Sequence, residues 1–206
     1  MKKGNSVKTL STTTREMVDT AILLALGIGL KLLSDLIPFL NLPDGGTIDL
    51  AMLPILLIGL RNGPKYGFAG STLFWLLCWA IGGFKIYSGF PLIEIVFDRL
   101  VPYTMGYGIA GLFWKKRGSR LTISLVIVLS FVIRLASHTI SGIFLWYSWT
   151  GFSELMVNFW ASFVYNVAYV GPTALICLVL FNALFRLVPY KAPLALKADE
   201  AEKAEQ

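Results

Sequence analysis

The sequence predicts an all-α integral membrane protein with six transmembrane helices and with both the N- and the C-terminus in the cytoplasm. Two observations carry this prediction. First, 56% of the residues are hydrophobic and only 15% are charged, with a mean hydropathy of +0.69, whereas a soluble domain is about 45–50% apolar and about 25% charged. Second, most basic residues fall on one side once the apolar segments are laid across a membrane.

Six segments are apolar enough to be transmembrane helices, each of which needs about 20 largely apolar residues. They cover residues 17–40, 50–61, 64–83, 91–113, 121–147 and 157–187. The second segment is short, and Gly63-Pro64 marks the break between it and the third. The chain therefore divides into a cytoplasmic N-terminal segment (1–14), a transmembrane domain (15–190) and a polar cytoplasmic tail (191–206).

The basic residues set the orientation of these segments. With the N-terminus inside, 14 of the 18 lysines and arginines lie on the cytoplasmic side. They are Lys2, Lys3, Lys8 and Arg15 before the first segment, Arg61 and Lys65 after the second, Lys115, Lys116, Arg117 and Arg120 after the fourth, and Arg186, Lys191, Lys197 and Lys203 at the C-terminal end. The positive-inside rule thus predicts cytoplasmic termini. Because topology accounts for these charges, we predict no nucleic-acid binding.

The common catalytic and metal-binding motifs are absent from the sequence. It has no phosphate-binding loop for ATP hydrolysis, no H-E-x-x-H and no G-x-S-x-G. Cys78 and Cys177 lie inside apolar segments and are expected to be small buried side chains. We therefore predict a protein that is not an enzyme and has no metal or cofactor of its own. Two alternatives are an intramembrane enzyme that uses Asp98 and His138 as acid and base, and a carrier that works alone.

Ionisable side chains inside the apolar segments are candidates for function, because each costs about 2.5–3.5 kcal/mol to insert. They are Lys31, Asp35, Glu94, Asp98, Arg99, Arg134 and His138. Arg134 and His138 are four residues apart and so share one helical face. We expect Arg134 to pair with Asp98 or Glu94 and to hold two helices together. Asp98 and His138 are expected nearer the outer surface, as binding residues.

An aromatic segment follows these residues along the chain. It runs from Phe144 to Trp149, and Trp160, Tyr165, Asn166 and Tyr169 come after it. Tryptophan and tyrosine often anchor a protein at the membrane interface, but an anchor does not explain the polar neighbours. Aromatic faces attract cations, and a carboxylate in a low dielectric supplies the counter-charge. The pattern predicts an outward-facing pocket for a flat, cationic or heteroaromatic solute.

Two further features belong to the start of the transmembrane domain. The glycine-containing loop Pro43-Asp44-Gly45-Gly46-Thr47-Ile48-Asp49 joins the first two segments, and it is either a plain connector or a cover over the pocket. In the first segment, Ala21, Ala25 and Gly29 form a stripe of small residues at four-residue spacing. Such a stripe lets another helix approach closely.

Several local motifs resemble those of one family. They are Ala21-x-x-x-Ala25 in the first segment, Gly45-Gly46-Thr47-Ile48-x-Leu50-x-Met52-x-Pro54 with Leu60-Arg61-x-Gly63, Arg134-x-x-x-His138-x-x-Ser141-Gly142 with Trp146, and Tyr165-Asn166-x-x-Tyr169 with Pro172. Together they resemble the substrate-binding subunit, or S component, of an energy-coupling factor vitamin transporter. Within that group the sequence is most similar to the thiamine-specific branch, from about Arg15 to about Leu187.

The resemblance implies a multi-pass protein of the bacterial plasma membrane whose pocket is capped by the loop between the first two helices. It implies three partners, which are a transmembrane coupling protein that docks on Ala21, Ala25 and Gly29, and two cytoplasmic ATPases. It also implies substrate-binding residues, which are Asp98, His138, Trp146, Asn166 and an aromatic residue at Phe74 or Trp75. We add Tyr165 and, near the loop, Asp49 as predicted substrate-binding residues.

The sequence departs from the family's pattern at four places. Arg99 follows the acidic residue where tyrosine is usual, Thr47 replaces a tryptophan of some members, Ala161 replaces a tyrosine, and Asp49 adds a charge. These departures leave the transporter class unchanged and leave the vitamin open. The expected ligand is thiamine, with a thiamine precursor or pyridoxine as the alternatives.

Overall fold

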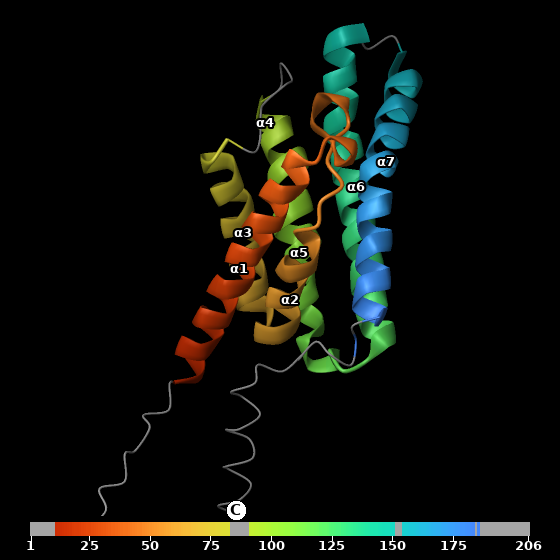
Figure 1. The fold of residues 1–206 in the computed structure, drawn as a ribbon. Coiled ribbons are helices and arrows are strands. Elements are labelled where there is room, and N and C mark those ends of the chain that lie inside the picture. The colour runs from red at the N-terminus through yellow and green to blue at the C-terminus, as the bar shows by residue number, and fades with distance from the viewer. Residues whose placement is uncertain (1–10, 83–90, 151–153, 184, 186–206) are drawn as a thin grey trace, which may run out of the picture.

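The computed structural model describes residues 11–82, 91–150, 154–183 and 185, and at Asp44 and residues 146–150 it describes the backbone alone. Within these ranges the chain makes six helical passes along one axis (Figure 1). The passes are α1 (Thr12–Leu36), α2 (Met52–Asn62), α3 (Pro64–Ala80), a composite fourth pass, α6 (Arg120–Thr150) and α7 (Leu155–Ala183). The predicted all-α fold with six helices is confirmed, with boundaries that differ by up to five residues from those expected.

The composite fourth pass consists of four successive helical segments. They are α4 (Pro91–Glu94), the π-helical η3 (Ile95–Met105), α5 (Gly106–Gly108) and the 3-10 helix η4 (Ile109–Lys116). Pro102 lies inside η3, where it cannot donate a backbone hydrogen bond and where its ring clashes with the preceding turn of an α-helix. A π-helical widening is one of the few ways a helix accommodates such a disruption.

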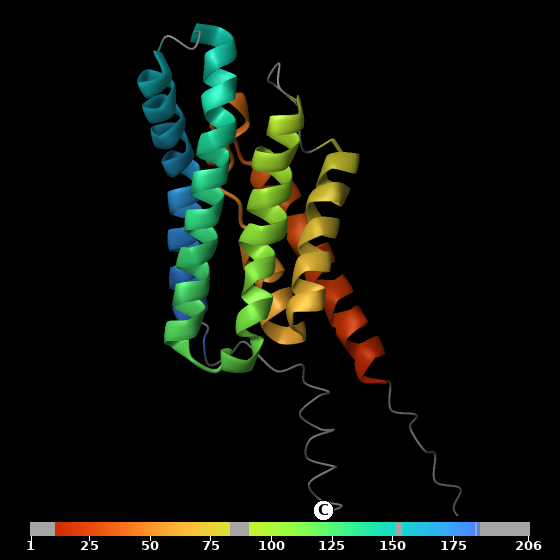
Figure 2. The same cartoon turned by 180° about the vertical axis from the view of Figure 1, so that it is seen from behind.

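The first and the last described helices meet the same face of the bundle. In Figures 1 and 2, the start of α1 and the last turn of α7 lie at the bottom, together with the α2–α3 turn and the turn between η4 and α6. Gly63, with φ of +87°, forms the α2–α3 turn directly before Pro64. An even number of passes places the two termini on one side of a membrane, in agreement with the predicted topology.

Glycines allow the helices at this end to approach each other closely. A Cβ added to Gly59 of α2 would lie 2.6 Å from the backbone nitrogen of Gly111, and one added to Gly67 of α3 would lie 3.0 Å from the carbonyl oxygen of Gly108. Backbone contacts of this kind are typical of helices that associate within lipid. They pack α2, α3 and the fourth pass tightly against one another.

Three described helices are long and apolar enough to cross a membrane by themselves: α1, α6 and α7. Only 22%, 44% and 33% of their most apolar windows are buried within the protein. The exposed remainder includes Ile22, Leu26, Leu125 and Val164. Since large apolar side chains cover the outside, lipid is the solvent that this surface fits.

Candidate substrate-binding site

The structure brings Asp98 and His138 together. Asp98 is on η3 and His138 on α6, and the carboxylate Oδ1 lies 2.6 Å from the imidazole Nδ1. His138 is 3% exposed, and its Nε2 has no hydrogen-bond partner among the described residues. Tyr103 and Tyr169 pack edge-on against the imidazole, with ring centroids at 6.1 and 5.8 Å. The Nε2 atom is therefore a buried polar group between two tyrosine rings, where it could form a hydrogen bond with a ligand.

Pro102 explains how these two helices are held in register. A π-helical residue at position 102 would bond to the carbonyl of Phe97, but proline has no N–H to donate. The hydroxyl of Ser137 donates to that carbonyl instead, at 2.6 Å. Because Ser137 is the neighbour of His138 on α6, this bond fixes the height of the imidazole relative to Asp98.

Arg99 occupies the second oxygen of the Asp98 carboxylate. Its Nη1 is bound to Asp98 Oδ2, and its Nη2 lies 3.7 Å from Glu94 Oε1. The side chains of Arg99 and Glu94 are only 12% and 6% exposed, so this three-residue ion cluster is largely shielded from solvent. Such clustering is how a membrane protein reduces the energetic cost of charged groups at depth.

The expected pairing of Arg134 with Asp98 or Glu94 is wrong. Among the described residues, the carboxylates of Asp98 and Glu94 pair with Arg99. The Arg134 guanidinium instead lies 5.0 Å and 5.4 Å from the ring centroids of Tyr107 and Tyr103. Gly106 provides the room, since a Cβ there would lie 2.9 Å from Arg134 Cγ. The ring faces stabilise the buried cation, and the arginine is a structural link between α6 and the fourth pass.

Residues 37–49, here called the lid, cover the upper part of the bundle. The short 3-10 helices η1 (Pro38–Leu40) and η2 (Pro43–Gly45) lie within the lid, and a bridge joins Asn41 to Thr47. The Asn41 side-chain amide donates to three carbonyls at the end of α1, at 2.8–3.1 Å. The lid is therefore an ordered structure with its own hydrogen bonds. That this loop covers a pocket stays a prediction.

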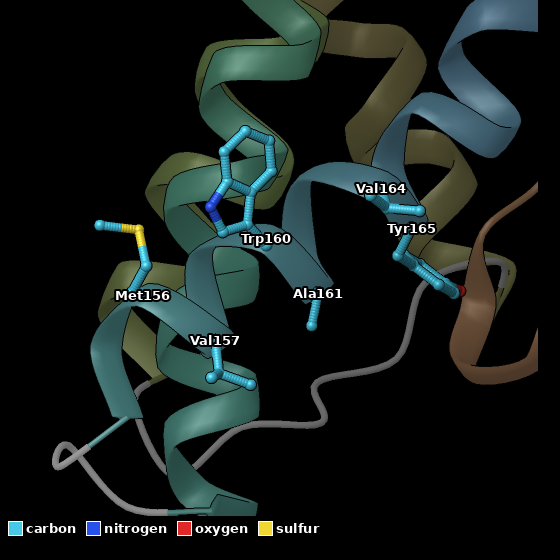
Figure 3. A pocket seen from close by; sticks show the side chains of 6 residues that line it. All are labelled: Met156, Val157, Trp160, Ala161, Val164 and Tyr165. Atoms are coloured by element: carbon cyan, nitrogen blue, oxygen red, sulfur yellow. The ribbon is translucent and has the colours of Figure 1, made fainter.

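Tyr165 of α7 fastens the lid. Its hydroxyl accepts a hydrogen bond of 2.8 Å from the backbone N–H of Gly46 and donates to the carbonyl of Pro43. Figure 3 shows the Tyr165 ring pointing toward the lid. A Cβ on Gly46 would lie 2.8 Å from the Tyr169 ring and 2.9 Å from the Tyr165 hydroxyl, so glycine is required for this close approach.

Asp49 anchors the end of the lid. Its backbone N–H donates to the Thr173 hydroxyl at 3.0 Å, and its carboxylate accepts from the Ala51 N–H at 2.8 Å and from the Tyr107 hydroxyl at 3.3 Å. Asp49 is 2% exposed. We predicted it as a substrate-binding residue, and the structure engages both carboxylate oxygens in internal hydrogen bonds, one of them to the residue directly before α2.

Asn166 belongs to a polar network between α6 and α7. Its amide nitrogen donates to the Ser162 carbonyl at 2.8 Å, and its oxygen accepts from the Tyr169 hydroxyl at 2.6 Å. Ser162 in turn donates to the carbonyl of Thr139, which follows His138. Through Tyr169, Asn166 is one ring away from His138. Trp146 was also predicted here, but its side chain lies outside the described residues.

The two candidates on α3 have different surroundings. Phe74 is fully buried, and its ring lies 6.0 Å from Tyr103 and 6.1 Å from Tyr107. The Trp75 indole donates to the Thr104 hydroxyl at 3.0 Å and stacks on Trp79. Phe74 thus supports the ring that touches His138, while Trp75 faces another side of the fourth pass.

A surface hollow lies on the other side of Tyr165. It is lined by Met156, Val157, Trp160, Ala161, Val164 and Tyr165 (Figure 3). Except for the Tyr165 hydroxyl and the Trp160 indole N–H, these side chains are apolar, and Met156 and Val164 are 68% and 62% exposed. Such a surface suits lipid and gives a charged solute no counter-ion. The candidate site is therefore the polar and aromatic cluster beneath the lid.

Three residues of the candidate site were not predicted from the sequence. Tyr103 packs against both Arg134 and His138, Tyr107 packs against Arg134, and Ser162 joins α6 to α7. A pair of tyrosines four residues apart in an apolar segment was an available signal, because such spacing puts both rings on one face. Ser162 had no such signal, since serine is common in transmembrane helices.

The predicted docking stripe lies on the outside of the bundle. Ala21, Ala25 and Gly29 are all exposed on α1, and a Cβ on Gly29 would have nothing within 4 Å. Gly27, by contrast, faces inward, where a Cβ would lie 2.6 Å from the Ile55 side chain. The stripe therefore remains available to another helix.

Comparisons with known proteins agree with this arrangement. Residues 17–192 match the model of the family described as Thiamine transporter protein. The thiamine transporter ThiT of Bacillus subtilis (strain 168) is 30% identical over 196 residues, which are 90% of this chain and 95% of that protein. A solved structure of ThiT from Listeria monocytogenes has a TM-score of 0.70 at 20% identity and covers 88% of this chain and all of that one. This last likeness concerns the fold.

Proposed function

Because the chain belongs to the thiamine transporter protein family, we propose that it is the substrate-binding subunit of an energy-coupling factor importer and that it binds thiamine beneath the lid. The observation that carries this proposal is the Asp98–His138 pair, enclosed by Tyr103 and Tyr169 under a lid that Tyr165 fastens. Thiamine joins a cationic ring to a flat, nitrogen-rich one. A carboxylate, an imidazole and aromatic faces are complementary to both.

Each side chain then has a distinct role in binding. Asp98 is ionised, and it supplies the counter-charge or accepts hydrogen bonds from the ring nitrogens. His138, through the unpartnered Nε2, and Asn166 fix the polar groups of the ligand. Tyr103 and Tyr169 form the aromatic walls, and Trp146 and the α3 aromatic residues are further candidates for stacking. Tyr165 holds the middle of the lid, and Asp49 holds its C-terminal end.

The proposal includes a coupling protein and two ATPases as partners. The exposed stripe of Ala21, Ala25 and Gly29 supports a helix-docking face. In addition, the sequence has no phosphate-binding loop, so ATP hydrolysis for this importer would come from other chains. A carrier that works alone would transport thiamine in liposomes that contain only this chain, and an enzyme would release a chemically altered ligand.

The test is intrinsic tryptophan fluorescence of the detergent-purified chain during titration with thiamine, its pyrimidine precursor and pyridoxine. Six tryptophans make stacking of a ligand visible. We expect saturable quenching by thiamine at nanomolar to micromolar concentration. A response to pyridoxine alone would keep the transporter class and change the vitamin. No response from folded protein to any of the three would contradict the proposed function.

A further inference from the structure

We propose that Arg99 determines the ligand specificity of this site by acting as an internal cation, which occupies Asp98 in the empty protein and withdraws to Glu94 when a cationic ligand binds. The inference rests on the proposed function.

The first support is that both oxygens of Asp98 are already engaged. His138 Nδ1 lies 2.6 Å from Oδ1, and Arg99 Nη1 is bound to Oδ2. A ligand that needs this carboxylate has to displace one of the two. His138 is 3% exposed and lies between two tyrosine rings, so it has little room to move. Arg99, which has a long and flexible side chain, is the partner that can leave.

The second support is a nearby position for the displaced guanidinium. Arg99 Nη2 is 3.7 Å from Glu94 Oε1, just beyond hydrogen-bond distance, while Nη1 contacts Asp98. A small rotation of the side chain would exchange one carboxylate for the other. The arginine remains paired throughout, so the site never holds an isolated buried charge.

The π-helix is what puts the three residues together. In an α-helix, residues advance by about 100°, so Arg99 would point about 140° away from Glu94. In a π-helix, residue i+5 bonds back to residue i, and the two lie on the same side of the helix. Glu94 is the residue directly before η3 and Arg99 is five residues later, and the guanidinium Nη2 lies 3.7 Å from the Glu94 carboxylate. The switch therefore depends on the helix type that accompanies Pro102.

Charge gives the mechanism its selectivity. Arg99 and a thiazolium ring are both cations, and at short range in a site of low dielectric they repel each other. A cationic ligand therefore competes with Arg99 for Asp98 and drives it toward Glu94. A neutral ligand exerts no such repulsion. Arg99 lowers the affinity for cations in this site, and Glu94 partly restores it.

The experiment compares thiamine affinity by fluorescence titration in wild type, Arg99→Gln, Glu94→Gln and the double variant. Arg99→Gln should tighten thiamine binding about 10-fold, because one charge-assisted bond no longer has to be displaced. Glu94→Gln should weaken binding, because Arg99 loses its second position. In the Arg99→Gln background, Glu94→Gln should have no effect, since no arginine remains to be accommodated. Arg120→Gln, an exposed arginine at the opposite end of the bundle, is the matched control.

A second ligand separates electrostatic competition from a merely structural role. The neutral aminopyrimidine alcohol corresponds to one half of thiamine and lacks the cationic ring. The gain from Arg99→Gln should be larger for thiamine than for this compound. Equal gains for both would overturn the competition between cations.

The outcomes also separate this inference from the proposed function. Wild-type protein that does not bind thiamine overturns both. If the wild type binds thiamine but Arg99→Gln leaves the affinity unchanged or weaker, the inference alone is overturned. The inference alone is also overturned if Glu94→Gln weakens binding as much in the double variant as it does by itself. If Arg99→Gln does not fold, Glu94→Gln decides by itself, and an unchanged thiamine affinity there overturns the inference.

Discussion

At the scale of single residues, Asp98 carries the most weight. It contacts His138 of α6 and Arg99 of its own helix, and the Nε2 of that histidine has no hydrogen-bond partner among the described residues. Its side chain is 23% exposed, which leaves one edge accessible to a ligand. An accessible carboxylate with buried partners is typical of a binding residue rather than of a purely structural one.

Replacing Asp98 by Asn should lower thiamine affinity about 10–100-fold. The variant removes a charge-assisted hydrogen bond worth about 1.5–3 kcal/mol. Fluorescence titration measures the change. Asp19→Asn is the matched control, because Asp19 pairs with Arg61 at 2.6 Å near the end of the bundle where α1 begins. Folded Asp98→Asn protein with wild-type affinity would remove this residue from the site.

Gly142→Ala should destabilise the protein by about 1–3 kcal/mol, as overpacking of a tight contact does. A Cβ at this position would fall well inside van der Waals contact with the Ser162 hydroxyl, which bonds to Thr139. Thermal unfolding in detergent measures the loss. Gly118→Ala is the control, since a Cβ there has nothing within 4 Å. Equal melting temperatures for the two variants would show that α6 and α7 can move apart around the added methyl group without a loss of stability.

Sequence reasoning found the chemistry of the site better than its geometry. The proximity of Asp98 and His138 was predictable because both are expensive in lipid and therefore need a reason to be there. The role of Arg99 was not predictable, because it depends on a π-helix, which is rare and has no pattern of its own. The position of Arg134 was missed for a related reason. An arginine was expected to seek a carboxylate, whereas two tyrosine faces surround it here.

At the scale of elements, the lid and α7 act as one unit. The lid is bonded to Tyr165 and Thr173, which are separated by about two turns of α7. Its own backbone bonds, from Leu42 to Gly46 at 2.6 Å and from Ile48 to Leu40 at 2.8 Å, keep it folded as a piece. Opening the site therefore requires breaking the contacts to α7 rather than unfolding the lid.

Tyr165→Phe should speed the release of thiamine by about 10-fold. The variant keeps the ring but removes both hydrogen bonds to the lid, at Gly46 and Pro43. Losing one such bond is worth about 1 kcal/mol, and the two act together. Stopped-flow fluorescence after mixing with excess unlabelled competitor measures the rate. Tyr66→Phe, at the other end of the bundle, is the control. A release rate equal to that of wild type would show that Tyr165 does not hold the lid.

At the scale of the whole molecule, the proposed binding site and the proposed docking face lie apart. The cluster around His138 lies beneath the lid, whereas the small-residue stripe lies on the outside of α1. The overall topology was predictable, because length, hydropathy and the distribution of basic residues depend little on side-chain detail. The irregular fourth pass was less predictable, since its segments differ in backbone hydrogen bonding rather than in composition.

Replacing Ala21 and Ala25 by Leu should abolish thiamine uptake by cells and leave thiamine affinity unchanged. Both positions are exposed, so the larger side chains can be accommodated in the isolated chain but keep a partner helix at a distance. Uptake of labelled thiamine and titration of the purified chain measure the two properties. Replacing the exposed Val132 on α6 by Leu is the control. Weakened binding in the double variant would show that the stripe belongs to the binding domain's own packing.

The unequal lengths of the helices have a consequence for the surrounding lipid. The 31 residues of α6 span about 46 Å, whereas the 17 residues of α3 span about 26 Å, and a bilayer core is about 30 Å thick. Helix α6 is therefore longer than the bilayer core is thick, and α3 is shorter. Such hydrophobic mismatch is relieved by tilting the protein or by thinning the bilayer locally. The empty subunit should accordingly sit inclined in the membrane, and its inclination should change with the chain length of the lipids.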